Sequence, residues 1–128
     1  MAQITDIVPI DDIVKGSTFS REVNFYIDNV LQTDITTAQV HWEVYNMDIK
    51  GGELITTHKE RLASGESLEE ENNAESSNVR TVYIHREVFL GEAFNDVKNI
   101  LIVIYVTINQ VTTLRRFSCR LLNVTESK

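Results

Sequence analysis

The sequence predicts an all-β fold: an antiparallel immunoglobulin-like β-sandwich of about seven strands, with one long acidic loop. The first observation behind this prediction is the segment 99–109, where nine consecutive residues between two asparagines carry no charge, glycine or proline. β-branched and aromatic side chains dominate the segment, and these fit a pleated strand better than a helix. The second observation is that short segments of strand-like pattern follow one another, separated by turn residues, with no amphipathic helix between them. A small β-barrel is the competing topology.

The N-terminal half supplies four of the expected strands. Pro9 places the first of them at a sheet edge, because proline cannot donate a hydrogen bond to a neighbouring strand. In the second and third strands apolar side chains recur at every second position, with Phe25 pointing inward and Trp42 as the largest core candidate. The glycine pair at 51–52 predicts a tight reversal, so we expect the fourth strand to pair with the third. The expected strands of this half are residues 4–10, 19–27, 40–45 and 53–59.

The C-terminal half begins with an abrupt change of composition. In residues 61–78 serine, glutamate and asparagine crowd in, and Leu62 and Leu68 are the only large apolar side chains, which predicts a long acidic loop. The dipeptide Asn109-Gln110 predicts a two-residue hairpin turn, since asparagine tolerates the positive φ that such a turn demands. The other elements expected in this half are strands at 79–89, 100–108 and 111–122, and a short helical turn at 92–94.

These elements predict a particular division between two sheets. In the last strand the side chains of Phe117, Cys119 and Leu121 share the face toward the core, whereas Arg116 and Arg120 share the opposite face. We expect one sheet to contain residues 4–10, 19–27 and 79–89, with or without 53–59, and the other to contain 40–45, 100–108 and 111–122.

The strand at 100–108 is apolar on both faces, and this decides the expected kind of function. One face packs on the opposite sheet, and the other carries Leu101, Val103 and Tyr105. Left open, these three side chains would expose a few hundred Å² of contiguous apolar surface, as much as the largest patch on a typical monomer. We therefore expect an oligomer or a bound subunit.

The alternative is that this second face is covered within one chain. The connection at 28–34 or the one at 90–97 would then fold over it, with Leu31 or Phe94 as the plug.

Basic residues concentrate on the segments 79–89 and 111–122. The ordinary interpretation of these arginines is a solvated strand face. The other interpretation is an interface patch that meets the acidic loop of a neighbouring copy. The arginines are Arg80, Arg86, Arg115, Arg116 and Arg120, and the candidate interface residues are Leu101, Val103, Tyr105, Arg116, Arg120, Glu69, Glu70 and Glu71.

Length, charge and cysteine content narrow the classes of function. A chain of 128 residues suits a single domain over residues 1–128. The formal net charge of −7 repels phosphate backbones, so we expect no nucleic-acid partner. Cys119 is the single cysteine, which excludes an internal disulfide and a thiolate metal cluster. No signal-peptide pattern opens the chain, and its apolar run is shorter than the ~20 residues of a membrane helix, so we expect no membrane partner.

Signatures of catalysis or ligand binding are weak. No two of His41, His58 and His85 have the spacing of metal ligands on one strand, and the aspartates near strand ends are explained by turn capping better than by calcium. Cys119 lies in mid-strand on the apolar face, where an inert thiol is expected. No glycine-flanked serine and no phosphate-binding glycine loop occur. We therefore expect no enzyme, no cofactor and no metal.

A resemblance to a known family rests on the segment 13–54, which contains Lys15-Gly16-Ser17-Thr18-Phe19, an alternating strand and then Ile35-Thr36-Thr37-Ala38-Gln39-Val40 before Trp42. This segment, about a third of the chain, resembles the N-terminal domains of phage baseplate upper proteins and related small β-sandwich virion proteins of tailed phages. In that family the turn reads KGDT and the connection reads DLTGATV, whereas here Ser17 replaces the aspartate and the connection lacks the glycine. The resemblance implies a structural component of the virion, made in the host cytoplasm and not enzymatic, and it transfers no functional residue.

Two function classes follow. The first is an assembly subunit of a phage particle (tail, neck, baseplate or capsid decoration) that contacts other virion proteins or copies of itself, as a homo-oligomer or repeated subunit. The second is a carbohydrate- or ligand-binding module, which would need a cluster of exposed aromatic side chains. Only Tyr26, Tyr45 and Tyr83 qualify, and they are not grouped in the sequence.

Overall fold

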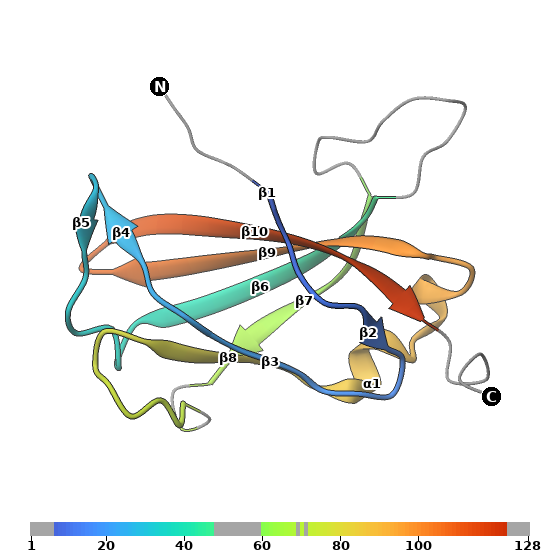
Figure 1. Ribbon diagram of the computed structural model, residues 1–128, viewed down its shortest axis with the longest axis horizontal. Helices are drawn as coiled ribbons and strands as arrows, with labels where there is room; N and C mark the ends of the chain where they lie inside the picture. The colour runs from blue at the N-terminus through green and yellow to red at the C-terminus, as the bar shows by residue number, and fades with distance from the viewer. Residues whose placement is uncertain (1–6, 48–59, 69, 71, 123–128) are drawn as a thin grey trace.

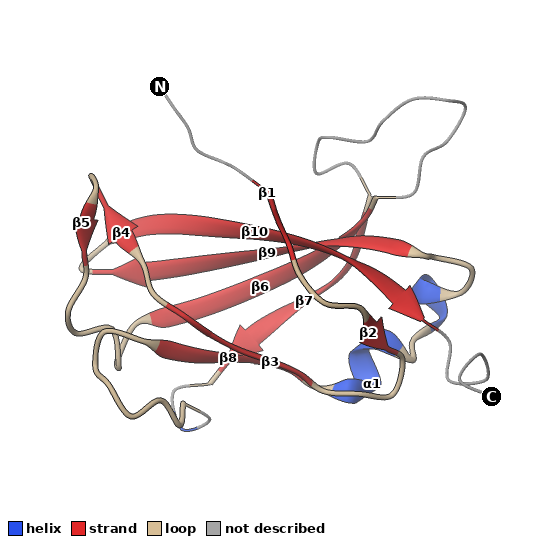
Figure 2. Cartoon of the chain, viewed as in Figure 1, coloured by secondary structure: helices blue, strands red, loops and turns tan. Residues whose placement is uncertain are grey.

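The computed structural model describes residues 7–47, 60–68, 70 and 72–122. Most of these residues lie in strands, and the longer helical segments are one turn each, α1 (Arg86–Phe89) and the 3₁₀ turn η2 (Glu92–Phe94), so the all-β class is confirmed (Figure 2). Ten strand segments occur among the described residues where about seven strands are expected. They are β1 (Ile7–Pro9), β2 (Ile13–Val14), β3 (Phe19–Val23), β4 (Tyr26–Ile27), β5 (Val30–Leu31), β6 (Gln39–Asn46), β7 (Arg61–Ser67), β8 (Arg80–Ile84), β9 (Asn99–Ile108) and β10 (Val111–Leu122) (Figure 1).

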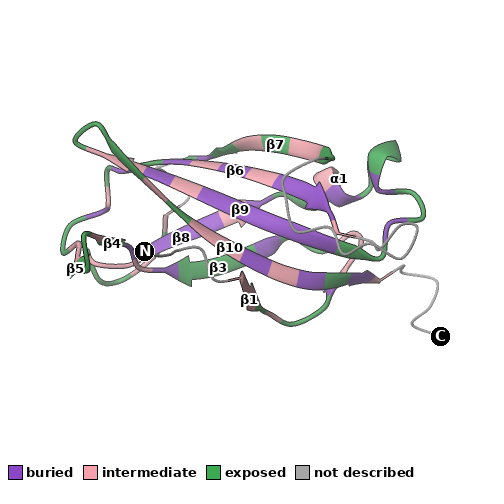
Figure 3. Ribbon diagram, turned by 90° about the horizontal axis from the view of Figure 1, so that it is seen from above, coloured by how far each residue is buried: buried purple, intermediate pink, exposed green. Residues whose placement is uncertain are grey.

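One large sheet has the strand order β1-β10-β9-β6-β7, and β2 also pairs with β10 (Figures 1 and 3). β9, the apolar strand expected at 100–108, lies in its middle between β10 and β6, both antiparallel to it. The turn between β9 and β10 holds Asn109 at φ 49° and Gln110 at φ 70°, the two positive values that a type I′ hairpin requires. The predicted hairpin and the mid-sheet position of this strand are therefore confirmed.

A second layer, formed by the antiparallel pair β3 and β8, packs against one face of the large sheet. The core lies between the layers and contains Trp42, Phe25, Ile102 and Ile104 in one buried cluster. Figure 3 shows the consequence as a buried stripe along β9. The predicted core is confirmed, and β4 and β5 form a small separate hairpin at one end of the molecule (Figure 1).

The predicted division between sheets is right for β6, β9 and β10 and for the β3–β8 pair, but wrong for the first strand. β1 lies in the large sheet, parallel to β10, with Ile7 opposite Arg116. The long strand β10 has an edge whose backbone groups need partners, and the N-terminal segment supplies them. The amides of Ile10 and Lys15 donate to the carbonyls of Ser118 and Leu122, at 2.9 and 2.8 Å. The strand expected at 53–59 falls outside the described residues.

The predicted loop at 61–78 is wrong over its first seven residues, which form β7 and pair with β6. The sequence pattern does not indicate a strand here, because most side chains of the segment are small or polar. The packing requires one of these residues, Gly65, to be small. A Cβ atom on Gly65 would lie 2.5 Å from Cζ2 of Trp42, so the indole ring occupies the space that a side chain would need. The partner strand and the ring, and not local preference, make this segment a strand.

The strand expected at 79–89 ends at Ile84. The next residues turn into α1, which carries Phe89 into the core, where its ring meets that of Phe94 edge-on with centroids 5.5 Å apart. Phe94 belongs to η2, the helical turn expected at 92–94, which is confirmed. No helix in the described part of the chain is long and apolar enough to cross a membrane.

Candidate functional site

The structure gathers five of the candidate interface residues on the outer face of the large sheet, away from the second layer. Val103 lies opposite Arg116 across the β9–β10 ladder, and Leu101 and Tyr105 lie two residues to either side of Val103 on the same face. Arg120 projects from the same face of β10, at the pair with Asn99. The candidate interface residues of β9 and β10 therefore lie on one face of the large sheet, and their role as an interface stays a prediction.

The expected exposure of this face is wrong. Val103 is fully buried and Leu101 is 2% exposed, because both lie in a second hydrophobic cluster that is separate from the core. Its other members are Tyr45, which is buried, and Ile7, Met47 and Tyr105, which are partly buried. Side chains of neighbouring strands therefore cover this face.

The two connections considered as covers do not contribute to this cluster. Phe94 is buried in the core between the layers, and Leu31 lies in β5, where it pairs with Tyr26. Cover within the chain is thus observed, and among the described residues it comes from Ile7 of β1, from Tyr45 of β6, from Tyr105 of β9 itself and from Met47.

A carboxylate, that of Glu43, organises the polar part of the outer face. One of its oxygens accepts hydrogen bonds from the hydroxyl groups of Tyr45 and Tyr105, at 2.5 and 3.2 Å. The other oxygen lies 3.2 Å from Nη1 of Arg61, which donates to it, and 3.3 Å from Nε2 of His41. Because Glu43 lies opposite Val103 in the β6–β9 ladder, this network adjoins the buried valine.

This environment shifts the ionisation of the network. Burial raises the pKa of Glu43, but the hydrogen bonds from Tyr45, His41, Tyr105 and Arg61 outweigh it and hold the pKa below its ordinary value. Burial, together with the hydrogen bond to Glu43 and its charge, raises the pKa of Tyr45 strongly and that of Tyr105 less. The network is therefore an ionised carboxylate held by neutral phenols, an arrangement that stabilises the sheet.

The predicted arginine patch does not form as one surface. Arg80 is buried, and its guanidinium donates to the backbone carbonyls of Ala38 and Ser67. It therefore ties β8 to the large sheet. Arg115 projects toward the core side of β10, opposite to Arg116 and Arg120.

The acidic partner proposed for this patch is only partly described. Glu70 is exposed, and Glu69 and Glu71 lie outside the described residues. The pairing of acidic loop and arginine strand between copies stays a prediction.

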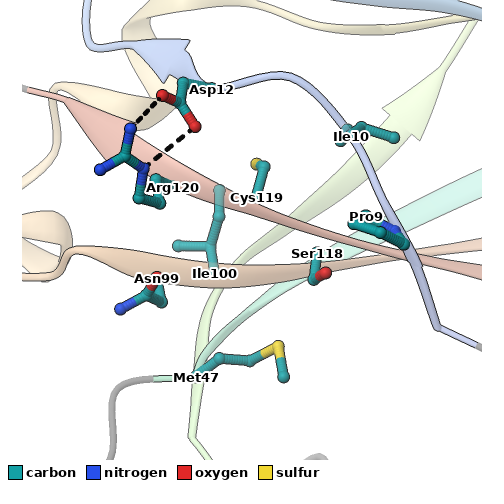
Figure 4. A pocket seen from close by; sticks show the side chains of 9 residues that line it. All are labelled: Pro9, Ile10, Asp12, Met47, Asn99, Ile100, Ser118, Cys119 and Arg120. Carbon is teal, nitrogen blue, oxygen red and sulfur yellow. Dashed lines mark hydrogen bonds and ion pairs between the residues drawn. The ribbon is translucent and has the colours of Figure 1, made fainter.

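Arg120 instead forms an ion pair within the chain, beside a groove of about 420 Å³ (Figure 4). Its guanidinium donates to both carboxylate oxygens of Asp12, at 2.7 and 3.2 Å. The groove lies where the N-terminal segment leaves the edge of β10 between β1 and β2, with Met47 and Asn99 on its other side. Cys119 also lines it, but burial, with a smaller effect of the charge of Asp12, raises the pKa of this thiol to about 12.

Sequence reasoning missed an exposed apolar group at the end of the molecule that carries the β4–β5 hairpin. The turn of this hairpin, Asp28-Asn29, has φ values of 51° and 66°, so a two-residue turn with both φ values positive joins the two strands. Four side chains of β4, β5 and the first residues of β10 are 38% to 60% exposed at this end of the molecule, namely Tyr26, Val30, Val111 and Leu114 (Figure 1). They do not share one face, because Tyr26 lies opposite Leu31 and Val30 opposite Ile27 in the hairpin, and Val111 and Leu114 lie three positions apart on β10.

The signal for this hairpin is present in the sequence. Asp28-Asn29 separates the apolar pairs Tyr26-Ile27 and Val30-Leu31, a pattern typical of a two-residue hairpin. Sequence analysis treats this segment instead as the end of a strand and a polar connection. It therefore places no apolar surface there.

Among the described residues no group of three or more histidine, cysteine, aspartate or glutamate side chains is placed to hold a metal ion. Comparison of the chain with protein-family models, with curated proteins and with solved structures gives no match.

Proposed function

We propose that the chain is a non-enzymatic structural subunit of a phage particle, which acts through contacts with other virion proteins or with copies of itself. The observation that carries the assembly role is the exposed apolar group at the β4–β5 end. Tyr26, Val30, Val111 and Leu114 make up four of the six large hydrophobic side chains that are exposed in the described part of the chain. The particle itself is suggested by the resemblance of residues 13–54 to baseplate upper proteins.

The β4–β5 end suits a contact surface for two reasons. Water-exposed apolar side chains that gather at one end of a small domain are typical of protein-binding sites. The hairpin also has a tight two-residue turn, and Gln32 N donates to the carbonyl of Phe25 at 2.9 Å behind it, so little conformational entropy is lost when it binds.

We propose the immunoglobulin-like sandwich as the finer fold. Two features support it: β6, β9 and β10 form one layer while β3 and β8 form the other, and the first strand runs parallel to the last. A β-barrel would require the two layers to be joined by strand pairing, and no described strand pairs with both layers.

Sedimentation measured over a wide range of concentration tests the assembly role. Val30→Glu places a charge in the exposed apolar group and should weaken self-association at least tenfold while leaving the melting temperature unchanged. Leu90→Glu is the matched control, because Leu90 is 58% exposed at the end of α1, far from the hairpin (Figure 1). Equal association of the two variants would reject this surface.

The assignment of the chain to a phage particle is tested separately. Antibodies against the chain should label purified virions, and the chain should appear among their proteins in stoichiometric amounts. A parent that stays monomeric at every concentration and is missing from virions would overturn the proposed function.

The groove beside Asp12 and Arg120 favours a second candidate, a carbohydrate- or ligand-binding module. Polar side chains line it next to apolar ones, including Asn99 and Ser118 with Met47 (Figure 4). Such a mixture is typical of small-molecule sites. Binding to a glycan array that is lost in Asn99→Ala would support this candidate, and its absence in the parent would remove it.

A further inference from the structure

Two arginines from different layers meet at one aromatic ring. The guanidinium carbon of Arg21, on β3, lies 5.1 Å from the ring centroid of Phe117, and that of Arg115, on β10, lies 5.6 Å from the same centroid. The ring itself is buried in the core. Cations at these distances over an aromatic ring are held in place by its electrostatic field. Both guanidinium groups therefore sit where β3 approaches β10.

This pair carries positive charge that no acidic side chain of the described chain compensates. Neither arginine forms an ion pair with a described residue, whereas Arg61 and Arg120 pair with Glu43 and Asp12. Within the described part of the chain, the pair forms one hydrogen bond, from Nη1 of Arg115 to the carbonyl of Asn24, at 2.7 Å. Two cations at one ring, with no acidic partner among the described residues, are unexpected on a chain whose net charge is −7.

The electrostatic state of the pair agrees with this geometry. Burial lowers the pKa of Arg115, and the positive charge of Arg21 lowers it further. The two like charges therefore repel one another at a partly desolvated position, and a bound anion would offset this repulsion.

Arg21 and Arg115 both line a hollow of about 200 Å³. Its walls come from the end of β3, from Val79 before β8 and from Arg115 on β10. Glu22 also lines the hollow, but it forms no ion pair with either arginine among the described residues.

We propose that Arg21 and Arg115 form a binding site for an oxyanion, the carboxylate or phosphate group of a ligand held between the two guanidinium groups. A guanidinium presents donors in a planar fork that matches the oxygens of both groups. The ring of Phe117 and the carbonyl of Asn24 hold the forks in position before the ligand arrives, so binding requires little ordering of long side chains. This site is independent of the contact surface at the β4–β5 end.

Thermal unfolding in inorganic phosphate, compared with sodium chloride at equal ionic strength, tests the site. A ligand that binds the folded chain alone raises the melting temperature, here by about 5 °C at ten times its dissociation constant. Arg21→Gln should abolish the specific rise while folding normally, because Arg21 is exposed. Arg115→Gln should do the same, and Arg86→Gln, which removes an exposed arginine of α1, should respond as the parent does.

A second arm distinguishes the two sources of the oxyanion. A tetraglutamate peptide that stabilises the parent at lower concentration than phosphate does would assign the site to acidic side chains of a partner, and the reverse order would assign it to a phosphate group. The proposal is overturned if neither probe stabilises the parent beyond the chloride control, or if Arg21→Gln responds as strongly as the parent.

Discussion

Glu43 shows how one carboxylate can complete the outer face of a sheet. Its alternating position places it on that face, but four partners make it a fixed part of the structure, and its side chain is only 12% exposed. The partners come from three strands, with Tyr45 and His41 on β6, Arg61 on β7 and Tyr105 on β9. The hydrogen bonds therefore connect neighbouring strands of the large sheet above the buried Val103.

Glu43→Gln should destabilise the protein by about 2 kcal/mol at pH 7, because hydrogen bonds to a charged acceptor are stronger than those to an amide. The folded pKa of Glu43 lies below its ordinary value of 4.5, so the ionised carboxylate contributes full stability above that pH. The contribution is lost as the pH falls through the lower folded pKa. Urea unfolding of parent and variant should therefore converge in acid.

Glu66→Gln is the control for this prediction, because Glu66 contacts His41 from a position whose side chain is 65% exposed. It should change stability by less than about 0.5 kcal/mol at any pH. A Glu43→Gln variant as stable as the parent at pH 7 would show that the network contributes nothing to folding.

The thiol of Cys119 should be inert in the folded protein. Burial raises its pKa to about 12, and the nucleophile in thiol chemistry is the thiolate, which at pH 8 is then about one part in 10⁴. A disulfide reagent should modify Cys119 at once in denaturant and only at the rate of unfolding in native buffer. Immediate modification of the native protein would place the thiol at the surface.

At the scale of elements, β7 shows a strand that its neighbours create. Its sequence, Arg61–Ser67, has small and polar side chains in place of the usual β-branched ones. Pairing with β6 satisfies its backbone, and the ring of Trp42 packs against Gly65. The packing of this edge strand therefore depends on the absence of a side chain at Gly65.

Gly65→Ala should therefore destabilise the protein by about 1 to 3 kcal/mol, since the new methyl group would overlap the indole and force it or the strand to move. Ser64→Ala, on the exposed side of the same strand, should be nearly neutral. Chemical unfolding monitored by Trp42 fluorescence measures both. A stable Gly65→Ala variant with unchanged fluorescence would mean that the ring does not pack on this strand.

At the scale of the whole molecule, the second face of β9 is covered within the chain. A substitution on this face should therefore change the stability of the fold and not the association between subunits. Val103→Glu should destabilise the protein by about 3 to 5 kcal/mol and unfold it, because a charge would be buried with no partner. Thr107→Glu, near the end of the same strand and half-buried, should be tolerated. Circular dichroism and light scattering distinguish unfolding from dissociation.

A Val103→Glu variant that stays folded but loses mass would contradict this account. It would mean that the second face of β9 contacts another subunit, as the apolar pattern of the sequence first suggests.

The sequence by itself determined the all-β class, the positions of β6, β9 and β10, the β9–β10 hairpin and the core around Trp42. These features depend on alternation and turn chemistry, which act between neighbours in the chain and can be read from residues such as Asn109 and Phe117.

Only the tertiary structure decided three other features. β7 is a strand because β6 and Trp42 lie beside it, and β1 joins the large sheet because β10 has an open edge. Arg21 and Arg115 meet at Phe117 although 94 positions separate the two arginines in the sequence. Each feature depends on contacts between segments distant in the chain, and a local pattern carries no information about which distant surface will satisfy a backbone edge or approach a ring.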